Sequence, residues 1–305
     1  MKKSLVYLTI FAAIAAVSSA APVNFPVEFT DGAPETTTWG YDVNSPGGGY
    51  FARFTQAGLD GGAIYTGYST AQAKCVFAGT SVDLWCKTQA NGGPFEAYLD
   101  DGQATFTGTM NEANPGTCPK IITLFTGLSN TLHTLAIKNT GVSGSDFIFI
   151  NKAVSEQPSP VTITRINDPD LTYAAPGDWG DQTDDNAIND CYGGETKYTV
   201  GGSSWSYTFT GTACAAVYRL RSDGGVVGYE VRDAGSNLVA AGSFPVYIPY
   251  TGATGYWSRW PFLLANNLPN GQYTATLTKV SGFISFVDAF YFVPGGTAVS
   301  DWSIY

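Results

Sequence analysis

The stretch Ser204-Trp-Ser-Tyr-Thr-Phe-Thr-Gly-Thr212 decides the fold class of this 305-residue chain. Its aromatic residues Trp205, Tyr207 and Phe209 alternate with serine and threonine. Such alternation is typical of a β-strand with one buried face and one face in water. The same period of two recurs in residues 81–84 and 273–278, and nothing after the N-terminus has convincing helical periodicity. We therefore expect an all-β protein.

Strand-like runs recur about every ten residues, which is the spacing of an antiparallel β-sandwich. Between them lie short turn sequences rich in glycine, aspartate and asparagine, such as Asp100-Asp-Gly102, Asp223-Gly-Gly225 and Pro269-Asn-Gly271. Turns of this kind join neighbouring antiparallel strands.

The chain also contains a degenerate duplication, because five segments of the first half resemble five of the second half in the same order. The clearest pair is Phe77-Ala-Gly-Thr80 and Phe209-Thr-Gly-Thr212. The other pairs are residues 95–100 with 228–233, 118–119 with 260–261, 127–137 with 267–277, and 147–151 with 283–288. A Pro/Ser-rich stretch between the halves is typical of a linker. The predicted organisation is a first β-sandwich module at 21–154, a linker at 155–162, a second module at 163–294 and a C-terminal tail at 295–305.

Residues 1–20 have the features of a cleaved secretory signal peptide. A basic start, Met1-Lys-Lys3, precedes an apolar run at residues 5–17, and small residues follow at 18–20. The run is too short to span a bilayer about 30 Å thick, and no later segment is apolar enough to do so. The sequence thus predicts a secreted, extracellular or cell-surface protein without a membrane span.

Composition excludes several classes of protein. A disordered chain has low hydrophobicity and many charges, whereas this one is 44% hydrophobic and 13% charged. A nucleic-acid partner is not expected, because the net charge is −10 and no basic cluster is present. Chemistry that uses several histidines is impossible, since His133 is the only one. We expect its ring nitrogens to bond to backbone groups at a strand edge.

The five cysteines favour disulfides if the protein is exported to an oxidising compartment. In the second half the expected pair is Cys191–Cys214. In the first half three pairings of Cys75, Cys86 and Cys118 are possible. Cys86–Cys118 is favoured, with Cys75 as a free thiol.

The order of these motifs resembles the galactose-binding-like jelly-roll modules of secreted carbohydrate-active proteins and fungal surface proteins. The order runs from a Trp through the Phe-x-Gly-Thr strands and an Asp-containing hairpin to Gly127-Leu-Ser-Asn-Thr-Leu-His-Thr-Leu135, and it ends on Phe147-Ile-Phe-Ile-Asn151. The resemblance covers nearly the whole mature chain twice. It implies two tandem jelly-roll domains that bind glycans through loops at one end, often beside a structural calcium ion. The second copy departs from the pattern at Gly271-Gln-Tyr-Thr274, so glycan binding does not follow for both modules.

Aromatic residues are the main candidates for glycan binding, because Trp and Tyr rings can stack on the flat C–H faces of sugars. Tyr256, Trp257, Arg259 and Trp260 form a cluster next to a loop-like Gly/Thr segment. Three more candidates are Trp179, Trp39 and Tyr41. The alternative is that each Trp fills the end of a sandwich, and Trp205 and Trp85 are expected in the core. Binding by stacking and hydrogen bonds would be largely insensitive to salt.

The acidic stretch at residues 168–190 offers oxygen ligands for calcium. The candidate ligands are Asp178, Asp181, Asp184 and Asp185, and the alternative is a solvated acidic loop. A glycosidase would need two carboxylates in a cleft. The candidates for this role all lie in hairpins, where aspartate commonly forms turns: Glu96, Asp100, Asp101, Asp223, Glu230 and Asp233.

The sequence favours a secreted, non-catalytic carbohydrate-binding protein whose partner is a polysaccharide or cell-surface glycan. Two weak sites on one polymer would raise the overall affinity. One alternative is a structural component of a wall, matrix or coat, which low charge and many turns fit equally well. The other is a polysaccharide hydrolase or lyase. The oligomeric state is left open.

Overall fold

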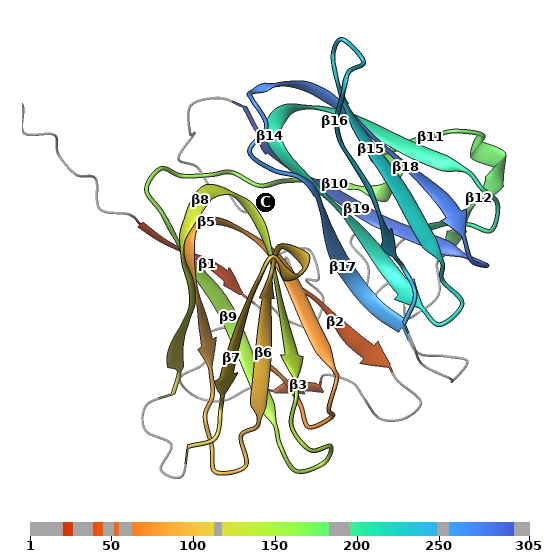
Figure 1. The fold of residues 1–305 in the computed structure, drawn as a ribbon. Coiled ribbons are helices and arrows are strands. Elements are labelled where there is room, and N and C mark those ends of the chain that lie inside the picture. Colours follow the sequence, from red (N-terminus) through yellow and green to blue (C-terminus); the bar gives the residue numbers. More distant parts are fainter. Residues whose placement is uncertain are drawn as a thin grey trace, which may run out of the picture.

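The computed structural model describes residues 21–26, 39–44, 52–54, 63–112, 118–182, 196–248 and 256–295. They form two antiparallel β-sandwich modules, which confirms the predicted all-β fold (Figure 1). The helical elements in this part of the chain are three single 3₁₀ turns, η1 (Asp100–Gly102), η2 (Asp168–Asp170) and η3 (Pro176–Asp178). No described helix has the length and apolar character needed to cross a membrane. The predicted signal peptide and the end of the predicted tail lie outside the described residues.

The first module comprises β1 (Ala21–Pro26), β2 (Trp39–Asn44), β3 (Ala52–Phe54), β4 (Ala63–Thr66), β5 (Gln72–Cys86), β6 (Pro94–Leu99), β7 (Ala104–Thr109), β8 (Lys120–Asn139) and β9 (Ile148–Gln157). The second comprises β10 (Thr164–Asn167), β11 (Thr172–Tyr173), β12 (Trp179–Gln182), β13 (Thr196–Thr199), β14 (Ser204–Arg221), β15 (Val226–Asp233), β16 (Leu238–Pro245), β17 (Tyr256–Ala265), β18 (Gly271–Ser281) and β19 (Ser285–Pro294).

Two long central strands, β5 and β8, belong to both sheets of the first module. Residues 72–79 of β5 pair with residues 131–138 of β8. Together with their neighbours they form one sheet in the order β7-β6-β8-β5-β2. Residues 81–86 of β5 pair with residues 120–126 of β8, and residues 83–86 also pair with β9. β1 and β4 also pair with β9, and β3 pairs with β4.

The second module repeats this pairing scheme, as the duplicated sequence predicts. β14 takes the place of β5, and β15 and β16 take the places of β6 and β7. β19 and β10 correspond to β9 and β1. Two strands take the place of the single strand β8. β18 pairs with residues 204–211 of β14, and β17 pairs with residues 214–221.

The glycine of the repeated Phe-x-Gly-Thr motif lies where the pairing register of the long strand shifts. The register of β5 against β8 shifts just after Gly79, and that of β14 against β19 shifts just after Gly211. A Cβ atom on Gly79 would lie 2.5 Å from the carbonyl oxygen of Glu156, and one on Gly211 would lie 2.2 Å from that of Val293. The last strand of each module therefore packs too closely for any side chain at this position.

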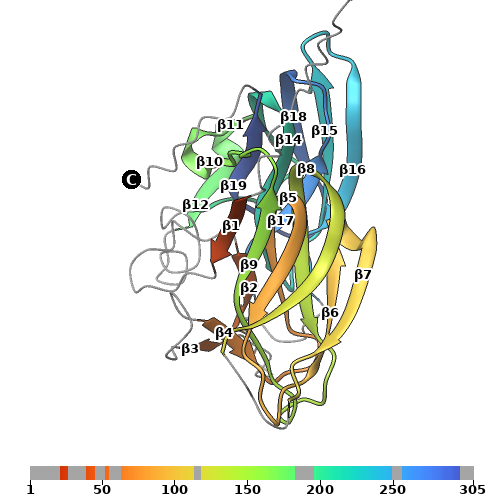
Figure 2. The ribbon, with the colours of Figure 1, turned by 90° about the vertical axis from the view of Figure 1, so that its left-hand side faces the viewer.

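Each module has its own hydrophobic core. Trp39, Phe77 and Phe95 are fully buried in the first core, and Trp205 with Tyr218 lies in the second. Trp205 thus occupies the core position predicted for it. Figure 2 shows the two modules from a second direction, with β5 and β14 running through the body of the molecule.

Trp85 does not share this placement. It lies on the face of β5 that also carries Ser81 and Asp83, and it is only half-buried. The ammonium group of Lys152 is 4.2 Å from the centre of its ring. The sequence prediction of a core Trp85 is therefore wrong, because the buried positions of this part of β5 are the alternate ones, Val82 and Leu84.

The two modules also share an interface. A third cluster of buried residues joins them, with Val76 and Leu132 from the first module and Ala215, Val217 and Tyr291 from the second. In addition, β2 of the first module pairs with β17 of the second, so that the hydrogen-bonded network continues across the interface. Figure 1 shows β17 extending from the second module to β2 of the first.

The predicted linker at residues 155–162 starts inside a strand. β9 ends at Gln157 and β10 begins at Thr164. Gln157 is buried, and its amide donates a hydrogen bond of 2.9 Å to the carbonyl oxygen of Ala78. The backbone N–H of Val161 donates to the other side of the same amide at 2.8 Å. This connection is therefore attached to the first module along part of its length.

The described cysteines, Cys75, Cys86, Cys118 and Cys214, all carry free thiols. The predicted Cys86–Cys118 disulfide is thus absent from the structure, and so is a bond from Cys214 to Cys191, which itself lies outside the described residues. The strand alternation directs Cys86 and Cys214 into the two module cores. There they pack as small apolar side chains.

Candidate functional site

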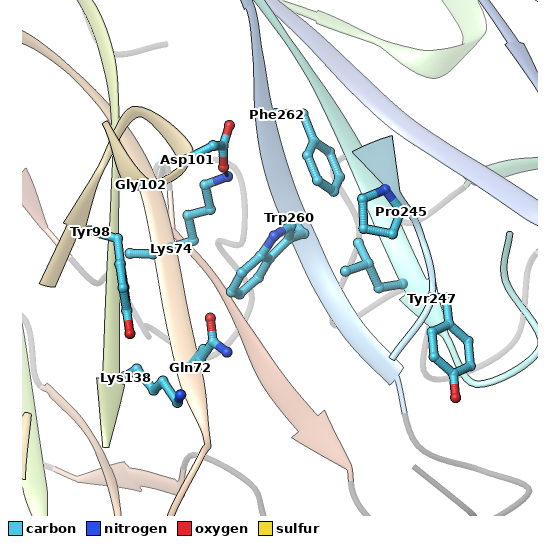
Figure 3. Close-up of a pocket in the computed structure, with 12 residues that line it drawn as sticks. Gln72, Lys74, Tyr98, Asp101, Gly102, Lys138, Pro245, Tyr247, Trp260 and Phe262 are labelled. Atoms are coloured by element: carbon cyan, nitrogen blue, oxygen red, sulfur yellow. Dashed lines mark hydrogen bonds and ion pairs between the residues drawn. The ribbon is translucent and has the colours of Figure 1, made fainter. Parts of the chain in front are cut away.

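A pocket of about 410 Å³ lies between the two modules (Figure 3). Its first wall comes from the first module and carries Gln72, Lys74, Tyr98, Asp101, Gly102, Ala136 and Lys138. Its second wall comes from the second module and carries Leu220, Pro245, Tyr247, Trp260 and Phe262. The first wall is mostly polar and the second mostly apolar and aromatic.

The first wall is the outer face of three neighbouring strands. Lys74 on β5 lies directly opposite Ala136 on β8, which in turn lies opposite Tyr98 on β6. One pair further along, Gln72 on β5 lies opposite Lys138 on β8. Successive strand residues point to opposite faces of a sheet. These side chains therefore face away from the core of the first module and toward the second module.

Lys74 is a buried cation at the centre of the pocket. It is 2% exposed and forms an ion pair with the Asp101 carboxylate. Its Nζ also lies 5.0 Å from the centre of the Phe262 ring and 5.8 Å from that of Trp260, within the range of cation–π attraction. Burial lowers the pKa of Lys74 even though Asp101 acts to raise it. This charge is therefore costly to bury, which is a common property of residues in functional sites.

Asp101 is held in place by an unusual turn. Asp100, Asp101 and Gly102 all have positive φ, at 46°, 57° and 99°. Buried Asp100 secures this turn, because its carboxylate accepts hydrogen bonds from the backbone N–H of Thr134 at 2.8 Å and from His133 Nδ1 at 2.7 Å.

His133 bonds on both sides of its ring. Its Nε2 lies 2.9 Å from the carbonyl oxygen of Ser129, opposite the contact with Asp100. Because both partners are acceptors, the doubly protonated ring satisfies both bonds. Burial lowers the pKa of His133, but the bond and charge of Asp100 and the Ser129 carbonyl outweigh it and raise the pKa above its ordinary value. The backbone bond was expected from the sequence and the carboxylate partner was not.

The second wall is closely packed where it is buried and is open at its rim. Phe262 stacks on Phe244, with ring centres 3.9 Å apart and planes 12° apart. Trp260 is 5% exposed, so only a small part of its ring surface is open to the pocket. Tyr247, in contrast, is 48% exposed and offers much of its ring to a ligand.

The aromatic candidates named from the sequence are not all brought together. Trp260 lines the pocket. Trp39 is fully buried, and its Nε1 donates a 3.0 Å hydrogen bond to the carbonyl oxygen of Phe25. Arg259 is 1% exposed, has a φ of 50° and is not among the lining residues. Trp179 is half-buried, with its ring centre 4.7 Å from that of Tyr173.

Tyr256, Trp257 and Tyr41 are described by their backbone alone. Trp257 pairs with Asp42, and Ser258 pairs with Tyr41, where β17 meets β2. The side chains of these three aromatic candidates lie outside the described part of the structure.

The candidate calcium ligands that the structure describes have partners within the protein. Asp178 Oδ2 accepts a 2.6 Å hydrogen bond from Ser203 Oγ, and Asp181 forms an ion pair with Lys197. Asp184 and Asp185 lie outside the described residues. Within the described ranges, no three His, Cys, Asp or Glu side chains are grouped so as to hold a metal ion.

The candidate glycosidase carboxylates are likewise engaged. Each makes a hydrogen bond or ion pair with a nearby group, in the pairs Tyr98–Glu96, His133–Asp100, Lys74–Asp101, Arg221–Asp223, Arg232–Glu230 and Asn237–Asp233. Of these carboxylates, only Asp101 lines the pocket.

Sequence reasoning missed most of the polar wall. Gln72, Lys74, Tyr98 and Lys138 had no motif that set them apart. The only signal was Lys74 itself, a single charge inside the otherwise uncharged segment Ala71–Thr80. A charge there indicates that one face of the strand is not covered by the module's own core.

No family model and no curated protein matches this sequence. Among solved structures, the chain aligns with a Paenibacillus xanthan lyase at 13% identity and a TM-score of 0.30, covering 81% of this chain and 25% of the lyase. It aligns with the C-terminal CBM6 of LamC, a marine laminarinase from Zobellia galactanivorans, at 19% identity and a TM-score of 0.30, covering 43% of this chain and 99% of that module. A carbohydrate-binding module CBM36 in complex with calcium and xylotriose aligns at 16% identity and a TM-score of 0.27, covering 42% of this chain and 97% of that module. This chain thus spans only a quarter of the lyase. All three scores are too low to say anything about its ligands.

Proposed function

We propose that this protein binds a carbohydrate chain, without cleaving it, in the pocket between its modules. The observation that carries the proposal is the pairing of a polar wall with an aromatic wall across one pocket. A sugar ring has flat C–H faces that pack on aromatic rings, and it has hydroxyl groups at its edge that need hydrogen-bonding partners. Tyr247 and Trp260 provide the first kind of contact, and the side chains of β5, β6 and β8 provide the second.

Binding is favoured over hydrolysis because the described lining residues do not include a pair of carboxylates. Most glycosidases use a pair of carboxyl groups about 5–10 Å apart. Asp101 is the one carboxylate among the lining residues that the structure describes, and it is paired with Lys74. A carboxylate that neutralises a buried ammonium group is poorly suited to transfer protons. Export through the N-terminal signal sequence remains part of the proposal, since a secreted protein would meet polysaccharides outside the cell.

The test is a glycan array that is probed with purified protein, with and without a calcium chelator, followed by titration of the best glycan. Tyr247→Ala should weaken binding at least fivefold, because this ring is exposed at the rim and can be removed without opening a core. Leu238→Ala is the matched control, since Leu238 is 52% exposed on the same module but outside the pocket. The proposal fails if no glycan is retained, or if Tyr247→Ala binds as tightly as Leu238→Ala.

A further inference from the structure

Two polar side chains of the pocket have no partner in the described part of the protein. The Lys138 ammonium group and the Gln72 amide make neither an ion pair nor a hydrogen bond with any described residue. They lie directly opposite each other on β8 and β5. Figure 3 shows their side chains next to each other at one end of the pocket. Together they present several N–H donors to whatever occupies this end.

The other charged groups around the pocket bond to other side chains. Lys74 is paired with Asp101. Glu96 lies opposite Lys138 in the sheet, but its carboxylate accepts the hydroxyl hydrogen of Tyr98 and does not bond to Lys138. The described lining residues carry two ammonium groups, Lys74 and Lys138, against one carboxylate, Asp101, in a chain whose overall net charge is −10.

We propose that the sugar bound in this pocket is acidic, and that Lys138 and Gln72 hold its anionic substituent, a carboxylate or a sulfate ester. This inference rests on the proposed carbohydrate-binding function. The Lys138 ammonium group donates a charge-assisted hydrogen bond to one oxygen of the anion, and the Gln72 amide donates to a second oxygen. Hydrogen bonds to ionised groups are about twice as strong as those between neutral groups. The ring of the same sugar packs against the aromatic wall formed by Tyr247 and Trp260.

The negative net charge of the protein makes the position of this cation important. The net charge of the protein repels an acidic polymer, so a local positive charge such as that of Lys138 favours contact at the pocket. Because Lys138 is half-exposed, its attraction to the anion is weakened by salt. Binding that depends on Lys138 should therefore fall with ionic strength, in contrast to the salt-insensitive binding that stacking alone predicts.

The experiment compares four polymers by isothermal titration calorimetry with the full mature protein. They are polygalacturonate, its carboxyl-reduced form, a sulfated galactan and the same galactan after desulfation. We expect at least one acidic polymer to bind ten times more tightly than its neutral counterpart. The pair that shows this difference identifies the substituent.

Three variants test the role of Lys138. Lys138→Met should abolish the preference for the acidic polymer, and Lys138→Arg should retain it. Lys120→Met is the matched control, because Lys120 is on the same strand, carries the same charge and lies outside the pocket. It should leave the preference unchanged.

Two results would overturn the inference and leave carbohydrate binding intact. One is equal affinity of the wild-type protein for each acidic polymer and its neutral counterpart. The other is a preference that persists in Lys138→Met. If none of the four polymers binds and the glycan array is also blank, the proposed function itself fails.

Discussion

His133 Nδ1 lies 2.7 Å from Asp100 Oδ2 in the interior of the first module. The residue after Asp100 is Asp101, whose carboxylate neutralises the buried Lys74 in the pocket. The chain's only histidine thus supports, through one turn, the only carboxylate among the described residues that line the pocket. A change in the protonation of His133 should therefore affect the stability of this region of the first module.

The first prediction concerns pH. The pKa of His133 is raised in the folded protein above its ordinary value of 6.5. The folded state therefore binds the proton more tightly than the unfolded state, and the stabilisation is fully present below pH 6.5. It is lost as the pH rises through the folded pKa. Urea unfolding of the wild type and of His133→Gln at pH 5.5, 7 and 8.5 should show a difference in unfolding free energy that shrinks as the pH rises.

A direct check is available from proton NMR. Since the chain has one histidine, its Cε1 proton gives one assignable signal. A midpoint at or below 6.5 in the native protein would contradict the assignment of a doubly protonated ring between Asp100 and Ser129.

The second prediction concerns the ion pair in the pocket. Asp101→Asn leaves the buried Lys74 ammonium without its counter-charge. Removing one partner of a fully buried pair costs about 3–5 kcal/mol. Asp101 is 47% exposed, so solvent screening reduces the expected loss to about 1–2 kcal/mol. The double variant Lys74→Met/Asp101→Asn should recover most of this stability in urea unfolding. An Asp101→Asn variant as stable as the wild type would show that Lys74 does not depend on this carboxylate.

The third prediction concerns the two glycines of the repeated motif. Gly79→Ala and Gly211→Ala each force a methyl group against the backbone of the last strand. Overpacking of this kind typically costs about 1–3 kcal/mol. Gly79 should be the more sensitive, because its φ of 139° adds strain for any other residue.

The matched control is Gly177→Ala. Gly177 lies in an exposed turn, and a Cβ atom there meets nothing within 4 Å. Its midpoint of thermal unfolding should stay close to that of the wild type. If all three variants unfold alike, the repeated glycine is not explained by the close approach of β9 and β19.

The sequence predicted the fold well because strand burial is a local property. The alternation around Trp205 shows directly which side of that strand is covered. The shared order of motifs in both halves then predicts a shared pairing scheme, and the pairings of β5 and β14 confirm it.

The pocket could not be predicted in the same way, because its walls come from distant parts of the chain. Lys74 and Lys138 are ordinary polar-face residues of their own sheet. They become a site only because β17 packs beside that face, and this placement depends on pairing with β2 and on the shared core between the modules. Trp260 was named as part of an exposed loop cluster, yet it lies within β17 as a nearly buried wall.

The last prediction separates structural from ligand-binding tryptophans. Trp39 was a binding candidate, but it is fully buried and donates a hydrogen bond to the carbonyl oxygen of Phe25. Trp39→Phe keeps most of the apolar volume and removes this donor, so a loss of about 1–3 kcal/mol is expected. The affinity of the folded fraction for the best glycan should not change.

Trp205→Phe in the second module is the matched comparison. It removes the 2.8 Å hydrogen bond from Trp205 Nε1 to the buried Tyr218 hydroxyl, and it should lower stability by a similar amount. Chemical unfolding and glycan titration of both variants separate the two roles. If Trp39→Phe loses glycan affinity at unchanged stability, then Trp39 contacts the ligand, and the binding surface lies on the first module and not in the pocket between the two.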